Sequence, residues 1–174
     1  MAIYMKLDKL DTIAGAATVP DVGGKKGLMA IDNVQFGAGR PIGIVVGSST
    51  HAETGQVDLS DISVARTCDG ASPFIQTFFF QPGGNGRTID FVITKADRKG
   101  AGMVPSMIIT LEEARLTSYS LSASSAQPSE SYSIAYTSIA IAHYNEEDNG
   151  EIKKGDTIKF DLATAKLVSA AKLP

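Results

Sequence analysis

The sequence lacks tryptophan altogether and has one cysteine and two histidines among its 174 residues. Because Cys68 is the single thiol, no disulfide can form within the chain, and the fold cannot depend on oxidation. Aromatic residues make up 7% of the chain, so the core must be built mainly from Ile, Leu, Val, Ala and Phe. The length fits one folded domain, residues 1–174, because a single core typically serves about 100–200 residues.

Strong charge of either sign is also missing. The formal net charge is −3 and the basic residues form no dense run, so neither nucleic acid nor anionic lipid is an expected partner. No stretch approaches the roughly 18 apolar residues of a membrane helix, so membrane insertion is not expected. Charges at Lys6, Asp8 and Lys9 interrupt the N-terminal segment before an apolar region forms. We therefore expect no cleaved signal peptide.

The residues of enzyme and metal sites are sparse. His51 and His143 fall in different segments without Cys or His at metal-ligand spacing, and the Gly-x-Ser-x-Gly motif does not occur. The acidic run 146–151 lacks the alternating oxygen ligands of an EF-hand loop, and its Asn149-Gly150 pair predicts a hairpin turn. We therefore expect no catalytic residues, no metal and no cofactor, and we do not expect an enzyme.

The sequence does contain many segments in which apolar and polar residues alternate, the period of a β-strand. The segment 131–144 would span about 45 Å when extended, a length typical of a strand that coils around a barrel wall. Together with the absence of an internal repeat, the pattern predicts a mainly β fold, a two-sheet β-barrel. The predicted strands are 3–7, 27–36, 56–66, 87–94, 106–122, 131–144 and 157–162.

One segment breaks this alternation and predicts the single helix of the chain. Ser72 followed by Pro73 is a typical N-cap and first-turn pair, and Gln81-Pro82-Gly83 ends the segment. Phe74 and Phe78 lie four residues apart and therefore share one face of the helix. We expect a short α-helix that flanks a sheet.

Two regions have weaker patterns. Residues 37–55 are rich in Gly, Ser and Thr around the apolar run from Ile42 to Val46. We expect an extended projecting loop there, because long loops in compact domains are usually functional or mobile. Residues 163–174 are rich in Ala and Lys, and we expect a weak helix or a flexible tail.

Two segments carry a family resemblance. Residues 57–75 join a strand to the helix that starts with Ser-Pro, and residues 107–119 read Met-Ile-Ile-Thr-Leu-Glu-Glu-Ala-Arg-Leu-Thr-Ser-Tyr. Together they resemble the Hcp family, the haemolysin-coregulated tube proteins of bacterial type VI secretion systems, and the order of elements is similar over nearly the whole chain. The positions that match are Arg66, Asp69, Ser72 and Pro73 in the first motif, and Ile108, Ile109, Thr110, Leu111, Glu113, Leu116 and Ser118 in the second.

The resemblance implies an Hcp-like, phage tail-tube-like β-barrel with a flanking helix, whose copies form a hexameric ring. Rings would stack into a hollow tube that a contractile sheath propels out of the cell, and they would shelter small effectors in the lumen. The implied partners are further copies of the chain, the type VI sheath and spike proteins, and small secreted effectors. The protein would be cytoplasmic before firing and extracellular afterwards, without a signal peptide.

The same resemblance gives the 37–55 loop a role, because the family's extended loop contacts the neighbouring ring. The candidate ring-stacking residues in this loop are Arg40, Ile42, Ile44, His51 and Glu53.

Other interpretations stay open. A monomeric ligand- or carbohydrate-binding β-sandwich predicts a concave aromatic site, and the absence of Trp counts against it. A small hydrolase on a β scaffold would need clustered His and acidic residues. A phage-type tail tube protein shares the predicted architecture and is hard to separate by sequence.

Overall fold

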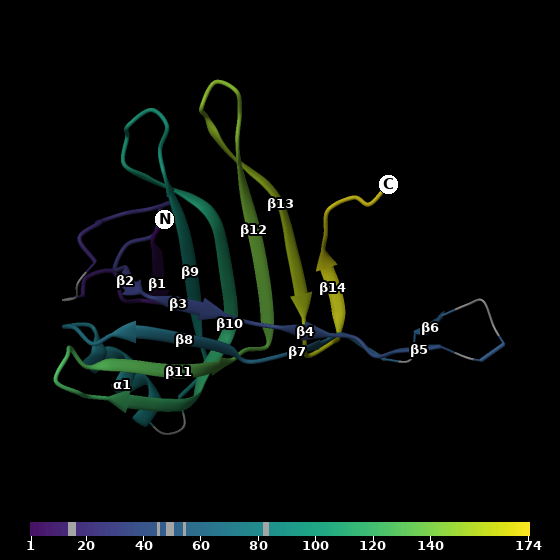
Figure 1. Cartoon of the computed structure of the whole chain (residues 1–174), viewed down its shortest axis with the longest axis horizontal. Coiled ribbons are helices and arrows are strands. Elements are labelled where there is room, and N and C mark those ends of the chain that lie inside the picture. Colours follow the sequence, from purple (N-terminus) through teal and green to yellow (C-terminus); the bar gives the residue numbers. More distant parts are fainter. Residues whose placement is uncertain (14–16, 45, 48–50, 54, 82–83) are drawn as a thin grey trace.

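The computed structural model describes residues 1–13, 17–44, 46–47, 51–53, 55–81 and 84–174. It is mainly β, with one short helix (Figure 1). Its elements in chain order are β1 (Ile3–Leu7), β2 (Met29–Ile31), β3 (Asn33–Gln35), β4 (Ala38–Gly39), β5 (Ile42–Ile44), β6 (His51–Glu53), β7 (Asp58–Leu59), β8 (Ile62–Thr67), α1 (Ser72–Phe80), β9 (Arg87–Ala96), β10 (Met103–Ser122), β11 (Ser129–Ala135), β12 (Ser138–Glu146), β13 (Ile152–Asp161) and β14 (Lys166–Ser169).

Strand β10 belongs to two sheets. Its first half pairs with β9 and β12 in the large sheet, whose order is β2-β1-β9-β10-β12-β13-β14. Its second half pairs with β11 in the small sheet, whose order is β10-β11-β8-β3. The change of partner occurs at a bulge between Leu111 and Ala114, where Glu113 has a positive φ of 50°. In Figure 1 the strands of the small sheet lie across the lower ends of the large-sheet strands.

The sheets meet again where the chain passes from β2 into β3. The amide of Asp32, between these strands, donates to the carbonyl of Ala65 in β8 at 3.0 Å. Arg66 Nε donates to the carbonyl of Ala30 in β2 at 3.1 Å.

The fold prediction of two β sheets with one short helix is confirmed. Strand pairing leaves the barrel open, because the pairing order of the described strands ends at β2, at β3 and at β14.

The main core lies between the two sheets and receives Ile75 from α1. Burying one such side chain stabilises the fold by about 1.5–3 kcal/mol. A second, smaller cluster lies on the other face of the large sheet, where Val22 and Leu28 pack over Tyr4, Val92 and Ile108. The fully buried side chains of the main core include Phe91, Met29, Ile62, Ile89, Leu111 and Ile134.

The prediction of one strand over 131–144 was wrong, because the chain turns between β11 and β12. Tyr136 follows the buried even-numbered positions of β11, and its hydroxyl donates to the carbonyl of Ser60 at 2.8 Å. The amide of Thr137 donates to the carbonyl of Glu112 at 3.0 Å, which places the turn beside the bulge of β10. The next buried apolar residue is the odd-numbered Ile139.

Two other predicted strands are also divided: the segment 27–36 contains β2 and β3, which pair in different sheets, and the segment 56–66 contains β7 and most of β8. Other predicted segments differ in smaller ways. The chain from Lys166 to Ser169 forms β14 on the edge of the large sheet instead of a weak helix. Asn149-Gly150 makes the predicted hairpin turn, with Gly150 at φ 78° and Asn149 Oδ1 accepting from the amide of Glu151 at 2.8 Å. Pro82 and Gly83, predicted to end the helix, lie outside the described residues.

Candidate assembly surfaces

The first family motif forms a buried polar network between α1 and the small sheet. Arg66 Nη1 lies 2.6 Å from Glu130 Oε1, and neither side chain is exposed. The Nη2 of Arg66 forms an ion pair with Asp69, just before the helix. Ser72 Oγ donates to Glu130 Oε1 at 2.9 Å. Buried charges persist only when they are paired and hydrogen-bonded, and this network provides both conditions.

Ser72 does not cap the helix as the sequence predicted. Ala71 holds the N-cap position without a side-chain hydrogen bond, and Ser72 is the first helical residue. Its hydroxyl instead accepts from the amide of Asp69 at 3.1 Å, while Asp69 Oδ1 accepts from the amide of Ala71 at 2.8 Å. Pro73 lies in the first turn, where its missing N–H removes no helical hydrogen bond.

The network also reaches β10. Tyr119 donates to Glu130 Oε2 at 2.7 Å and accepts from Gln76 Nε2 of α1 at 3.0 Å. Partial burial and the hydrogen bond to Glu130 raise the pKa of Tyr119. Sequence reasoning missed Glu130, Tyr119 and Gln76, because only the strand register brings them to Arg66. The network fixes α1 against two strands and thereby fixes which face of the helix meets solvent.

The second family motif follows β10 through its change of partner. Ile108, Ile109 and Leu111 are buried, and Thr110 Oγ1 donates to Asp90 at 2.6 Å. Glu113 is exposed at the bulge. Farther along the strand, Leu116 is half-buried and Ser118 is exposed on the small sheet. The described contacts of the buried positions belong to the packing and strand pairing of β10.

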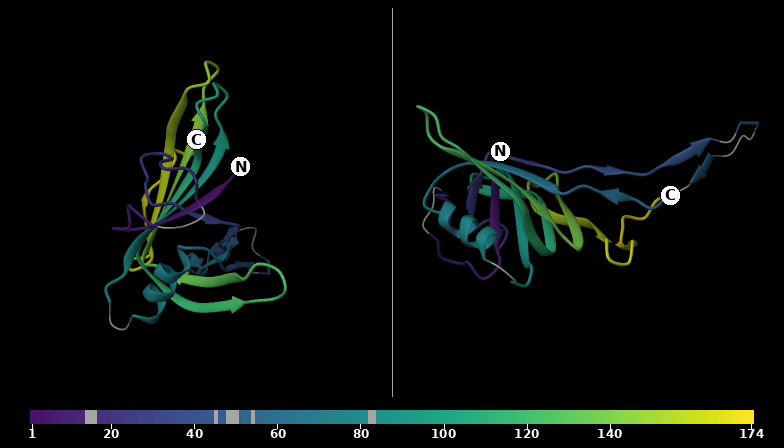
Figure 2. Two further views of the ribbon diagram at one scale, coloured as in Figure 1. Left: turned by 90° about the vertical axis from the view of Figure 1, so that its left-hand side faces the viewer. Right: turned by 90° about the horizontal axis from the view of Figure 1, so that it is seen from below.

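The described residues of the region 37–55 form most of a narrow β arm that projects from the barrel. At its base β4 pairs with β7, and farther out β5 pairs with β6 (Figure 2). Ile42 is 61% exposed and Val46 is 99% exposed. Of the candidate stacking residues, Arg40 lies between β4 and β5, Ile42 pairs with Glu53, and Ile44 pairs with His51.

A second apolar surface lies at the open edge of the large sheet. Leu167 and Val168 of β14 are 56% and 61% exposed, and Leu167 pairs with the half-buried Phe160 of β13. An unpaired edge with exposed apolar side chains favours contact with another chain. The arm and this edge are therefore candidate contact surfaces.

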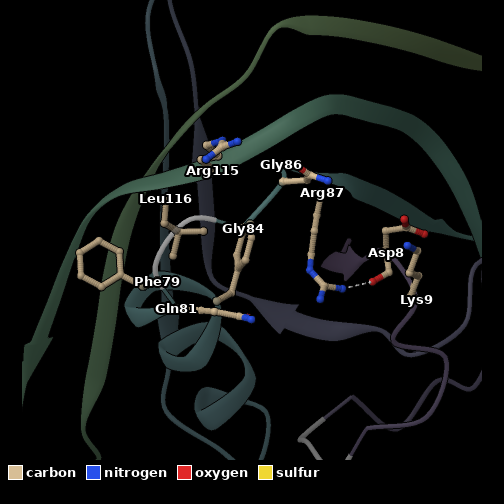
Figure 3. Close-up of a pocket in the computed structure, with 11 residues that line it drawn as sticks. Asp8, Lys9, Phe79, Gln81, Gly84, Gly86, Arg87, Arg115 and Leu116 are labelled. Carbon is tan, nitrogen blue, oxygen red and sulfur yellow. Dashed lines mark hydrogen bonds between the residues drawn. The ribbon is translucent and has the colours of Figure 1, made fainter.

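A pocket of about 360 Å³ opens beside the C-terminal end of α1 (Figure 3). Arg87 on its wall donates to the carbonyl of Asp8 at 3.1 Å. The described lining residues include no Ser, Cys or His. The lining residues are Asp8, Lys9, Phe78, Phe79, Gln81, Gly84, Asn85, Gly86, Arg87, Arg115 and Leu116.

Two searches of the described part of the chain bear on other functions. His, Cys, Asp and Glu form no group of three or more that could hold a metal ion there. In the same residues, no helix has both the length and the apolar character needed to cross a membrane.

Comparison with known proteins gives a consistent result. The model of the family described as "Type VI secretion system effector, Hcp" matches residues 4–143. No curated protein matches the chain. A solved structure described as a type six secretion system protein aligns with TM-score 0.74 and 23% identity, covering 95% of this chain and 98% of the other. Hcp1 from Salmonella typhimurium aligns with TM-score 0.66 and 15% identity, covering 96% and 98%. The structural likeness establishes the fold, and the family match covers most of the chain.

Proposed function

Because the chain belongs to the Hcp family of type VI secretion system proteins, we propose that it is a structural subunit of the secretion tube. Hexameric rings of the chain stack into a hollow tube, and the tube carries small effectors in its lumen. The subunit is cytoplasmic before firing and leaves the cell with the tube. Its partners are further copies of itself, the sheath and spike proteins, and the effectors. It performs no catalysis.

The arm is the observation that carries this proposal. It extends away from the barrel, and on it Ile42 stays 61% exposed and Val46 99% exposed within the single chain. Fully burying an aliphatic side chain stabilises a contact by about 1.5–3 kcal/mol. A projecting arm with exposed aliphatic residues is therefore suited to contact a neighbouring subunit.

The open edge at β14 supports the same conclusion. The arm and β14 are different surfaces of one chain, so contacts that use them join unlike patches on successive copies. Such head-to-tail contacts close into rings or continue into filaments, whereas self-complementary contacts stop at a dimer.

The test is the solution mass of the purified protein by light scattering, with negative-stain images of the same peak. A sixfold mass with ring-shaped particles is the expected result. A monomer at high protein concentration would overturn the proposal and favour a ligand-binding β-sandwich.

A further inference from the structure

Three basic side chains line the pocket beside the C-terminal end of α1, and strand pairing brings them there. The amide of Asp8, just after β1, donates to the carbonyl of Thr88 in β9 at 2.9 Å, which brings Lys9 toward Arg87. Arg87 is also the register partner of the residue that precedes Arg115 in β10. Figure 3 shows Arg87 and Arg115 on separate strands at the pocket. The three cations therefore come from three adjacent strand ends.

These cations lack an acidic partner. Within the described residues, no ion pair joins Lys9, Arg87 or Arg115 to a carboxylate. Asp8 is the single acidic residue among the described lining residues, and it is the backbone carbonyl of Asp8 that accepts from Arg87. Like charges on neighbouring strands repel one another. An anion in the pocket would replace this repulsion with attraction.

The backbone of Lys9 is itself unusual. Its φ is 63°, in the left-handed region that Gly and Asn adopt more readily than lysine does. The turn at this position is closed by the amide of Leu10, which donates to the carbonyl of Leu7 at 3.2 Å. Such a conformation has an energetic cost and is found most often at functional sites. Here it places a lysine on the wall of the pocket.

The loop before β9 adds backbone donors to the same pocket. Gly84 and Asn85 are exposed, and their amides donate to no other described residue. Gly86 holds the loop close to β10, because a Cβ there would lie 2.5 Å from the backbone of Glu113. Free amides in a turn commonly bind anions. The loop therefore provides neutral donors beside the three cations.

The remaining wall of the pocket is apolar. Phe78 and Leu116 are half-buried and pack against the main core, so their positions are fixed by the fold. Phe79 lines the pocket beside them. The volume of about 360 Å³ lies at the lower end of the range of about 300–1,000 Å³ that is typical of small-molecule sites. The pocket thus combines a cationic side with an apolar side at a size suited to a small ligand.

From these features we propose that the pocket binds a small phosphate monoester of the nucleoside monophosphate class. The phosphate lies among the three basic side chains, and the organic part of the ligand lies against the apolar side. A phosphate monoester carries a charge of about −1.5 to −2 at pH 7 and three acceptor oxygens, so it matches three cations better than a single carboxylate does. Arginine also fits phosphate through paired hydrogen bonds. The site belongs to the single subunit and does not depend on the proposed tube.

The test is isothermal titration calorimetry of the full chain at low ionic strength, with adenosine monophosphate, inorganic phosphate and adenosine as separate probes. Arg115→Gln removes an exposed cation of the pocket. Lys9→Asn removes a second cation with a residue that tolerates the positive φ. Lys154→Gln, at an exposed position of β13 outside the pocket, is the matched control. Circular dichroism checks that each variant is folded.

Adenosine monophosphate should bind more tightly than inorganic phosphate, and adenosine should not bind. The dissociation constant of adenosine monophosphate should rise about tenfold or more in Arg115→Gln and in Lys9→Asn, because each loses a charged hydrogen bond, and should stay unchanged in Lys154→Gln. Added salt should weaken the binding.

Three results would overturn the assignment. They are the absence of heat with adenosine monophosphate at millimolar concentration, equal binding by adenosine, and equal affinity in the folded Arg115→Gln and unsubstituted proteins. Binding of a peptide with the acidic sequence 145–151 in place of adenosine monophosphate would also overturn it, and would indicate a contact between copies of the chain. Light scattering of the same samples reports assembly, so a failure of this site is distinguishable from a failure of the proposed function.

Discussion

Arg66 and Glu130 are register partners on β8 and β11, and their side chains form an ion pair of 2.6 Å from which solvent is excluded. Both side chains point to the inner side of the small sheet, directly behind the serines of its outward face. The pair also connects β2 through the carbonyl of Ala30 and α1 through Ser72. It therefore lies where the two sheets and the helix meet.

Removal of one partner of this pair should destabilise the folded state strongly. We expect Glu130→Ala to lower the free energy of unfolding by about 3–5 kcal/mol, because it leaves the buried Arg66 incompletely compensated. Urea denaturation measures the change. Ser131→Ala, at the adjacent exposed position, is the matched control and should stay within about 0.5 kcal/mol of the unsubstituted protein. Equal effects of the two substitutions would show that the network does not hold the fold.

Stability should fall in alkaline solution because of Tyr132. Burial raises the pKa of its hydroxyl far above the ordinary value, and within the described part of the chain the hydroxyl donates to the weak acceptor Met5 Sδ at 3.5 Å. Below about pH 10 the tyrosine is protonated in both states and its stabilising contribution is fully present. Above that pH the unfolded chain releases the proton while the folded chain keeps it, so the stability decreases.

The decrease due to Tyr132 should approach about 1.4 kcal/mol for each pH unit. Tyr132→Phe removes the titrating group and should reduce the slope of the unfolding free energy against pH by about that amount. Chemical denaturation at a series of alkaline pH values provides the measurement. An unchanged slope in the variant would contradict the assignment.

Two nearby glycines should differ sharply in their tolerance of a methyl group. A Cβ at Gly86 would lie 2.5 Å from the backbone of Glu113, at the bulge where β10 changes sheets. We expect Gly86→Ala to destabilise the fold by about 1–3 kcal/mol, the usual cost of overpacking. Gly84→Ala meets nothing within 4 Å and serves as the control. Thermal unfolding of the two variants decides the matter, and matching midpoints would argue against a tight contact at the bulge.

Assembly should depend on the arm without affecting the fold of the subunit. Ile42 is 61% exposed, so Ile42→Asp should change the free energy of unfolding by no more than about 0.5 kcal/mol. Placing a carboxylate in an apolar contact should nevertheless weaken ring stacking. Light scattering and images of particle length report stacking, with Ser124→Asp on the β10–β11 turn as a charge-matched control. Unaltered stacking in Ile42→Asp would exclude Ile42 from the ring-to-ring contact.

Several features of the fold were predictable from local pattern. Ile3–Leu7 alternates and forms β1, and the Ser-Pro pair starts the helix within one residue of the predicted position. The break after Tyr136 also had a local signal. The bulky apolar residues occupy even-numbered positions up to Tyr136 and odd-numbered positions directly after it. That signal was missed because both phases looked like one continuous strand.

Other features depend on register and could not be derived from the linear sequence. Arg66 and Glu130 are 64 residues apart, and their partnership exists only once β8 pairs with β11. The serines of the small sheet are scattered over distant segments and become one surface only when four strands align. Strand β14 is short, and its pairing with β13 outweighs the weak helical preference of an Ala- and Lys-rich segment.

The passage of β10 through both sheets has a consequence for how the subunit comes apart. This single strand of 20 residues contributes hydrogen bonds to both walls, so neither wall can lose it without disturbing the other. Independent melting of one sheet would require β10 to detach over half its length while the rest stayed paired. The subunit is therefore built to unfold in one cooperative step, without a partly opened intermediate.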